Sequence, residues 1–227
     1  MPQELVQVPE LTAAVQDYAK AIYTLETRDG TVSTTALAER LDVRPASVSG
    51  MLRKLAVLGL VEHEPYKGVR LTERGRLVAL EVIRHHRLLE LFLVENLGMS
   101  WDEVHAEAEV LEHVLSEDLE ELIAAKLGDP TLDPHGDPIP SRELTIADEK
   151  GRALYDVEPG ESATFVRVSD ADPEMLRFLA ERGIAPGAKL KVVERQPFDG
   201  PLYARAGGKT HVLGATLARA MRVSEEA

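Results

Sequence analysis

Residues 34–57, TTALAERLDVRPASVSGMLRKLAV, decide the fold of the N-terminal part of the chain. Residues 34–41 place apolar side chains at helical spacing, and a second helix is predicted to begin at Pro45, because proline is tolerated in the first turn of a helix. The three residues 42–44 separate these helices, which is typical of a helix-turn-helix unit. The apolar stripe of the second helix consists of Val48, Met51, Leu52 and Leu55.

The flanking residues extend this unit to a winged helix. A preceding helix is predicted from the apolar spacing of Val15, Ala19, Ile22, Tyr23 and Leu25. Residues 60–63 and 69–71 predict two short strands joined by a turn at Gly68. An ordinary three-helix core with serines on its surface would account for the helices, but it would leave the wing and the local positive charge unexplained.

The outward-facing residues of this region are of the kinds that contact DNA. Small hydroxyls near the start of a recognition helix can contact base edges and phosphates, and arginine and lysine suit phosphates. Residues 40–76 carry eight basic side chains against four acidic ones, a net charge of +4. The predicted DNA contacts are Arg44, Pro45, Ser47, Ser49, Arg53, Lys54, Lys67 and Arg70.

The rest of the chain predicts a helical middle region and a small β-rich C-terminal region. Residues 76–97 and 100–127 are expected to form two long helices, the second beginning at a capping box of Ser100 and Glu103. Four prolines between residues 129 and 140 indicate a loop. A short helix is expected from Pro173, and strands are expected at 163–168, 189–195, 202–206 and 211–213, which together favour a small barrel.

Composition narrows the class of protein. The 227 residues include no cysteine, which excludes disulfides and thiolate metal sites. No apolar stretch approaches the roughly 20 residues of a membrane span, and residues 1–10 do not resemble a signal peptide, so we expect a soluble cytoplasmic protein without a membrane partner. The net charge of −13 is concentrated in residues 101–150, which hold fifteen acidic and three basic residues. The overall negative charge therefore does not exclude DNA binding by the N-terminal region.

One acidic helix in the middle region carries the clearest chemical signal. Glu109, Glu112 and His113 stand at i, i+3 and i+4 and therefore share one face, with His105 one turn earlier. Two carboxylates and two imidazoles on one stripe would repel each other, or would be costly to bury, unless something positive lay among them. A divalent metal ion meets this requirement.

Together these features resemble the metal-dependent repressors of the diphtheria toxin repressor family, including its manganese-sensing branch. The motifs that carry the resemblance are the winged helix, QDY at 16–18 with Ile22-Tyr23, RHHRLLE at 84–90, Glu109-x-x-Glu112-His113, GDPIP at 136–140 and the C-terminal barrel. The implied fold is mainly α with a small β domain. Its parts would be a winged helix-turn-helix domain at 1–72, a helical metal-binding and dimerisation domain at 73–142, a linker at 143–161 and an SH3-like domain, similar to FeoA domains, at 162–227.

The resemblance implies two metal sites. The main site would use Asp17, Glu109, Glu112 and His113, and a second site would use His86, Glu90 and His105. Iron-sensing relatives place a methionine at Asp17 and a cysteine at Glu109, so carboxylates at these positions favour the harder Mn(II) ion. Fe(II) remains an alternative because a given site generally binds Fe(II) more tightly than Mn(II). Lys20 stands where the manganese branch has a glutamate, and a charged lysine cannot act as a ligand.

Some family ligands come from the C-terminal barrel, for which Asp170 and Asp172 are candidates here. His85, by contrast, is expected to be a surface or packing residue, and His135 to be structural or exposed.

The function implied is that of a homodimeric, metal-activated repressor of metal-uptake genes that binds a double-stranded DNA operator, and not that of an enzyme. Metal held by Asp17 and the acidic helix would fix the DNA-binding domain. The apolar face of residues 104–122, with part of residues 88–97, is the candidate dimer interface, and the alternative is that this face belongs to the core of the protomer. The alternatives are an iron-dependent global repressor of the same family, a winged-helix regulator that senses an organic ligand, and a metal-dependent hydrolase. A hydrolase would leave the winged helix unexplained.

Overall fold

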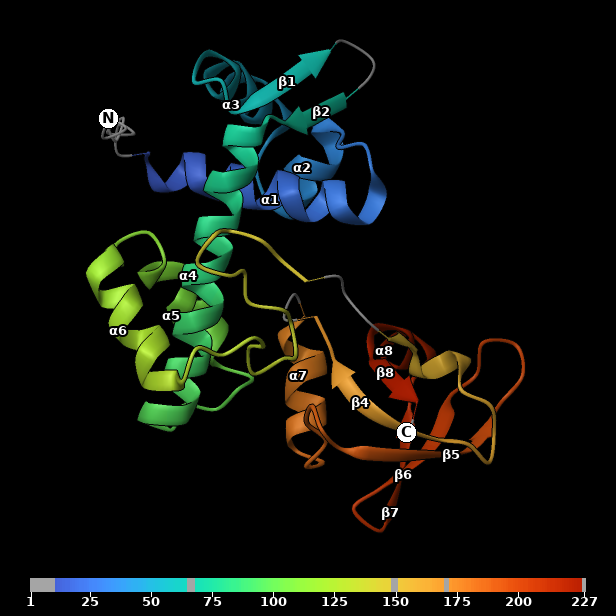
Figure 1. Cartoon of the computed structure of the whole chain (residues 1–227). Coiled ribbons are helices and arrows are strands. Elements are labelled where there is room, and N and C mark those ends of the chain that lie inside the picture. Colours follow the sequence, from blue (N-terminus) through green and yellow to red (C-terminus); the bar gives the residue numbers. More distant parts are fainter. Residues whose placement is uncertain (1–10, 65–67, 148–150, 170–171, 226–227) are drawn as a thin grey trace. The chain divides into compact units, whose positions relative to one another are not determined.

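The computed structural model describes residues 11–64, 68–147, 151–169 and 172–225 (Figure 1). The chain forms two compact units, residues 1–84 with 142–145 and residues 85–141 with 146–227, and each is described by itself. None of the helices in the described ranges combines the length and the apolar character needed to cross a membrane.

The first unit is a winged helix. It contains α1 (Ala13–Asp29), α2 (Thr34–Arg40), α3 (Pro45–Val57), β1 (Val61–Glu64), β2 (Gly68–Leu71) and the start of α4 (Glu73–Leu97). The Ser33 hydroxyl caps α2 by accepting from the backbone N–H of Ala36, and Pro45 lies in the first turn of α3, as its fixed φ favours. The strands β1 and β2 pair antiparallel, with Val61 opposite Leu71. The predicted winged helix-turn-helix is therefore confirmed.

The helical part of the second unit differs from the predicted single helix over 100–127, and that prediction is wrong. The chain forms α5 (Val104–Leu111) and α6 (Glu117–Leu127), which Figure 1 shows beside the second half of α4. The Ser116 hydroxyl accepts from the N–H of Leu119, and three acidic residues in the next turn suit the positive end of a new helix.

The predicted capping box is also wrong. Residues 101–103 form turns, and the Glu103 side chain makes no capping hydrogen bond. The Ser100 hydroxyl instead donates a hydrogen bond to the carboxylate of Asp102.

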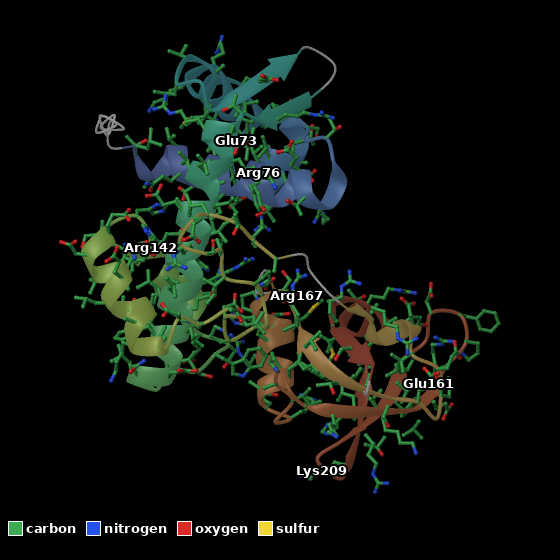
Figure 2. The ribbon with its side chains drawn as sticks, in the orientation of Figure 1. Glu73, Arg76, Arg142, Glu161, Arg167 and Lys209 are labelled. Atoms are coloured by element: carbon green, nitrogen blue, oxygen red, sulfur yellow. The ribbon has the colours of Figure 1, made fainter. Side chains whose placement is uncertain are left out.

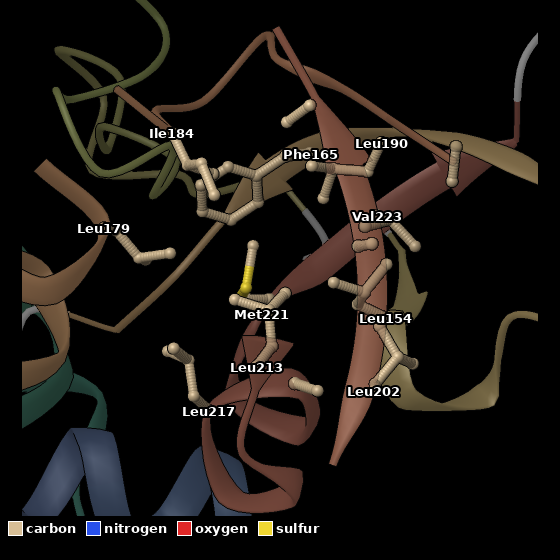
Figure 3. Packing of buried hydrophobic residues seen from close by; sticks show 14 of the residues in the cluster. Leu154, Phe165, Leu179, Ile184, Leu190, Leu202, Leu213, Leu217, Met221 and Val223 are labelled. Carbon is tan, nitrogen blue, oxygen red and sulfur yellow. The ribbon is translucent and has the colours of Figure 1, made fainter. Parts of the chain in front are cut away.

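The C-terminal part of this unit is a six-stranded antiparallel sheet with strand order β3-β8-β4-β5-β6-β7. Its elements are β3 (Arg152–Ala153), the 3₁₀ turn η1 (Leu154–Asp156), β4 (Ser162–Arg167), α7 (Pro173–Ala180), β5 (Lys189–Arg195), β6 (Leu202–Ala206), β7 (Lys209–Leu213), α8 (Ala215–Ala220) and β8 (Arg222–Glu225). Phe165, Ile184, Met221 and Val223 pack in its buried core (Figure 3). The sequence did not predict α8 or β8, and β3 falls in the stretch assigned to the linker.

Candidate metal centre and DNA-binding surface

Helices α4 and α5 bring the three predicted second-site residues into contact. His86 and Glu90 lie one turn apart on α4, with His86 Nε2 3.0 Å from Glu90 Oε1. His105 Nδ1, from α5, lies 3.3 Å from the same oxygen and 3.1 Å from His86 Nε2. Glu90 is fully buried, so its charge has little access to water and depends on its neighbours.

Two of the three main-site residues of this unit lie beside the same histidine, His86, and the third, His113, lies beside one of them. Glu112 Oε2 is 2.5 Å from His86 Nδ1, and Glu109 Oε1 is 4.0 Å from it and 3.7 Å from His105 Nε2. His113 Nε2 is 3.7 Å from Glu112 Oε1. Although α5 ends at Leu111, Glu112 keeps helical backbone angles, so the predicted one-face spacing is retained. The two predicted sites therefore share one continuous cluster in this unit.

Asp17 lies in α1, half-buried, in the other compact unit. Its participation in the main site therefore stays a prediction from the resemblance.

Two further residues of the cluster, Asp133 and His135, were missed by the sequence analysis. His135 Nδ1 is 3.5 Å from Glu90 Oε2, both residues are fully buried, and Oε2 has no hydrogen-bond partner. His135 Nε2 lies 2.7 Å from the carbonyl oxygen of Trp101, which can only accept, so the Nε2 proton is donated there. In a neutral His135 ring, the bare Nδ1 would then face a carboxylate oxygen, an arrangement that requires a proton or a metal cation between them.

Burial and crowding shift the pKa values of the carboxylates here. Burial together with the negative charges of Asp137 and Glu90 raises the pKa of Asp133 to about 7, although Arg87 and His135 oppose the rise. Burial also raises the pKa of Glu90, but the neighbouring side chains of His105, His135 and His86 outweigh it and hold that pKa well below its usual range. Close oxygen and ring-nitrogen atoms of this kind are ligands that divalent transition metals accept.

Arg87 of α4 holds the loop that carries these residues. Its guanidinium lies 3.6 Å from carboxylate oxygens of both Asp133 and Asp137 and donates to the carbonyl of Pro138. Arg167 of β4, labelled in Figure 2, lies 2.6 Å from Asp137. The Asp133 side chain also accepts from the backbone N–H groups of His135 and Asp137. Each of these contacts fixes the position of His135 relative to Glu90.

Of the two barrel candidates, the structure describes only Asp172, which has a capping role. Asp172 is the N-cap of α7 and accepts from the backbone N–H groups of Glu174 and Met175, and Asp170 lies outside the described residues.

The predicted DNA-contacting side chains that the structure describes are exposed. Ser47, Ser49, Arg53 and Lys54 lie on the outer face of α3, whereas Val48, Leu52 and Leu55 are buried beneath it. Arg44 and Pro45 are exposed at the start of α3, and Arg70 is exposed on β2. Lys67 lies outside the described residues.

Three domain families match the chain in order. The N-terminal DNA-binding domain of iron-dependent repressors matches residues 10–69, the metal-binding and dimerisation domain of the same repressors matches residues 72–141, and the FeoA domain matches residues 152–225. The iron-dependent repressor IdeR of Mycobacterium tuberculosis is 33% identical over 95% of this chain and 99% of its own length. This chain belongs to the iron-dependent repressor family.

Other members of the iron-dependent repressor family are similar over nearly the whole chain. The diphtheria toxin repressor of Corynebacterium diphtheriae is 27% identical over 95% of this chain and 99% of its own length. A structure described as a manganese-dependent transcriptional repressor in complex with manganese is 44% identical, with a TM-score of 0.85, and the match covers 93% of this chain and 100% of that one. The manganese regulator SloR is 30% identical, with a TM-score of 0.77, over 95% and 100% of the two chains.

Proposed function

We propose that this chain is a metal-activated, DNA-binding repressor of metal-uptake genes that responds to Mn(II), with Fe(II) as the alternative ion. The observation that carries the proposal is the buried cluster in which Glu90 lies between three histidines and continues through His86 to Glu112. Its donor atoms are oxygen and nitrogen, and the chain has no cysteine. Such a donor set favours a harder ion than one that includes sulfur.

The residues proposed to hold metal fall into two groups. Asp17, Glu109, Glu112 and His113 form the main site, and His86, Glu90 and His105 form the second site. We add His135, which faces the remaining oxygen of Glu90, and Asp133, because one possible ligand atom from each of Glu90, Asp133 and His135 lies within 4.8 Å of the others. When bound, a divalent ion supplies the positive charge that the crowded carboxylates lack. Asp17 belongs to the winged-helix unit, so its side chain would make the position of that unit depend on metal.

The proposed dimer surface lies on α5, on α6 and on the turn between them. Val110, Val114, Leu119 and Leu122 are 69%, 75%, 49% and 68% exposed. When several large apolar side chains are exposed near one another, they mark an interaction surface more often than a solvated face. The predicted interface also included Val104 and Ala108, but both are fully buried within the unit and belong to its own core.

Dimerisation gives the proposed function its geometry. A symmetric dimer presents two copies of α3, and two operator half-sites require a defined separation between them. Metal that restricts the winged-helix units to one arrangement would favour operator binding, and by thermodynamic linkage the operator would tighten metal binding.

The test is operator binding titrated with Mn(II), and with Fe(II) without oxygen, for the wild type, Glu112→Ala and the control Glu107→Ala. Glu107 is an exposed glutamate of the same helix that no proposed site includes. We expect metal to raise the operator affinity of the wild type and of the control by at least tenfold, and to leave Glu112→Ala unchanged. Equal metal activation of all three proteins would refute the proposal, and the absence of any metal binding in dialysis would favour an organic ligand.

A further inference from the structure

His85 and Glu120 form a buried pair that the proposed sites do not use. His85 precedes His86 on α4, but its ring contacts different groups: Nδ1 lies 3.1 Å from the carbonyl oxygen of Glu112, and Nε2 lies 3.0 Å from Oε2 of Glu120. Both side chains are 8% exposed. The sequence pattern predicts only a surface or packing residue at position 85, whereas the structure shows a residue with a specific partner at each end of its ring.

The chemistry of these partners fixes the orientation of the ring. A carbonyl oxygen can only accept, so Nδ1 must donate to Glu112. Nε2 then shares a proton with the carboxyl group of Glu120, because a bare nitrogen and a carboxylate oxygen would repel at 3.0 Å. A ring turned over would lose both contacts in a buried place, where unmade hydrogen bonds are costly. His85 is therefore held in one orientation.

The contact with Glu112 fixes the backbone that carries two proposed ligands. Glu112 is the C-cap of α5, and the last carbonyls of a helix have no partner within it. His85 supplies a partner for this carbonyl, while the carboxylate of the same residue reaches His86 Nδ1 at 2.5 Å. The next residue is His113. The position of the Glu112 carbonyl thus constrains the side chains of both Glu112 and His113.

The contact with Glu120 connects the same ring to α6. Glu120 lies on the buried face of that helix, whereas Leu119 and Leu122 extend from it as part of the proposed dimer surface. One side chain of α4 therefore contacts both the end of the ligand-bearing helix and the helix that presents the dimer surface.

We propose that His85 is a positioning residue which, through Glu112 and Glu120, couples metal binding to dimerisation. This inference rests on the proposed function, since it assumes that Glu112 and His113 bind the metal and that α6 contributes to the dimer. Positioning groups of this kind change metal affinity by about 10–100-fold when removed. Because linkage is reciprocal, the pair should make the dimer stronger with metal and metal binding stronger in the dimer.

Two variants separate the two contacts of the ring. In His85→Asn the side-chain amide occupies the place of Nδ1 and keeps the donor to Glu112, whereas in His85→Gln it extends toward Nε2 and keeps the contact with Glu120. We expect His85→Asn to bind Mn(II) within about threefold of the wild type and His85→Gln to bind at least tenfold more weakly. The visible spectrum of bound Co(II), which reports ligand geometry, should change only in His85→Gln.

The coupling is measured by sedimentation with and without Mn(II) for Glu120→Ala and its neighbour Glu121→Ala, which is exposed on α6. We expect Mn(II) to strengthen dimerisation of the control at least fivefold and to have no effect on Glu120→Ala. Circular dichroism establishes whether each variant is folded. Glu120→Gln, which can still hydrogen-bond to Nε2 of His85, should keep the effect of Mn(II) on dimerisation, and its loss in a folded Glu120→Gln would contradict this role of the pair.

The outcomes separate this inference from the proposed function. Equal Mn(II) affinities and Co(II) spectra of His85→Asn and His85→Gln, in a wild type that binds Mn(II), would overturn the positioning role alone. A dimer of Glu120→Ala that responds to Mn(II) as the control does would overturn the coupling. A wild type that binds neither Mn(II) nor Fe(II) would overturn both the inference and the proposed function.

Discussion

Glu90 shows at the scale of single residues why this cluster suits a cation. Its carboxylate is fully buried, and His86, His105 and His135 all direct ring nitrogens at it. A neutral imidazole donates from one nitrogen, and His135 donates from Nε2 to the carbonyl of Trp101. Protons on the rings or bound metal must therefore balance this carboxylate, and metal does so without charging the histidines.

Replacement of His135 by phenylalanine tests its proposed role. The His135→Phe ring fills a similar volume but offers no nitrogen to Glu90, so we expect the second site to lose at least tenfold in Mn(II) affinity while the main site keeps its own. Titration followed by electron paramagnetic resonance measures both sites. His211→Phe is the control, because His211 lies on β7, away from the cluster. Unchanged stoichiometry and affinity in His135→Phe would remove His135 from the set of ligands.

Sequence patterns predicted some of these residues and not others. His86 and Glu90 stand one turn apart on a helix, where spacing alone fixes the face they share, and the family motif pointed to His105. Asp133 and His135 lie in an irregular loop whose shape depends on Arg87, Arg167 and the Asp133 hydrogen bonds to the backbone. Periodicity carries no information about such a loop, although the GDPIP motif beside it was a signal.

At the scale of elements, the break between α5 and α6 is the feature that the apolar pattern did not predict. The apolar spacing of residues 104–122 continues through the break, so the pattern alone predicted one helix. Ser116 and the acidic residues after it mark a second start. Each of the two helices has its own buried and exposed face: Val104 and Ala108 are buried but Val110 is exposed on α5, and Ile123 is buried but Leu122 is exposed on α6.

Ser116→Ala removes the N-cap of α6. We expect the free energy of unfolding of the metal-free protein to fall by about 0.5–1 kcal/mol, because the capping bond to Leu119 is exposed and 3.4 Å long. Urea denaturation measures the change. Ser100→Ala serves as the control, since Ser100 caps no helix, and an equal loss in both variants would contradict the assignment of the helix start.

Gly136→Ala tests how closely the loop that carries Asp133 and His135 approaches β4. A Cβ at Gly136 would lie 1.9 Å from the carbonyl oxygen of Val166, and the backbone angle φ of Gly136 is +87°. Gly187 has a similar φ of +91° with open space around it, so Gly187→Ala measures the backbone strain alone. We expect Gly136→Ala to lower the free energy of unfolding by about 2 kcal/mol more than Gly187→Ala does. Equal losses would mean that the loop does not lie against β4.

For the whole molecule, charge is divided between functions. The chain carries a net charge of −13, but residues 40–76, which include the recognition helix and the wing, carry a net charge of +4, whereas residues 101–150, which include most of the proposed ligands, carry −12. This separation allows a protein that is acidic overall to bind phosphate through one unit and metal through another.

Arg53→Ala should weaken operator and non-specific DNA binding alike. Arg53 is exposed on α3 and suits a phosphate contact, so its loss should lower the slope of log affinity against log salt concentration by about 1 per protomer. Fluorescence anisotropy over a range of salt concentrations measures this slope. The control is Arg177→Ala on α7, an exposed arginine of the C-terminal domain, and an unchanged slope in Arg53→Ala would remove Arg53 from the DNA surface.

Anomalous diffraction at the manganese edge, from crystals grown with Mn(II), would show whether one metal ion bonds to both units of the chain. We expect a peak bonded to the side chains of Glu112 and His113, with Asp17 of α1 completing the site and so joining the winged helix to the metal. Crystals whose anomalous map has no peak beside Glu112 and His113, or has one there that Asp17 does not contact, would contradict this expectation.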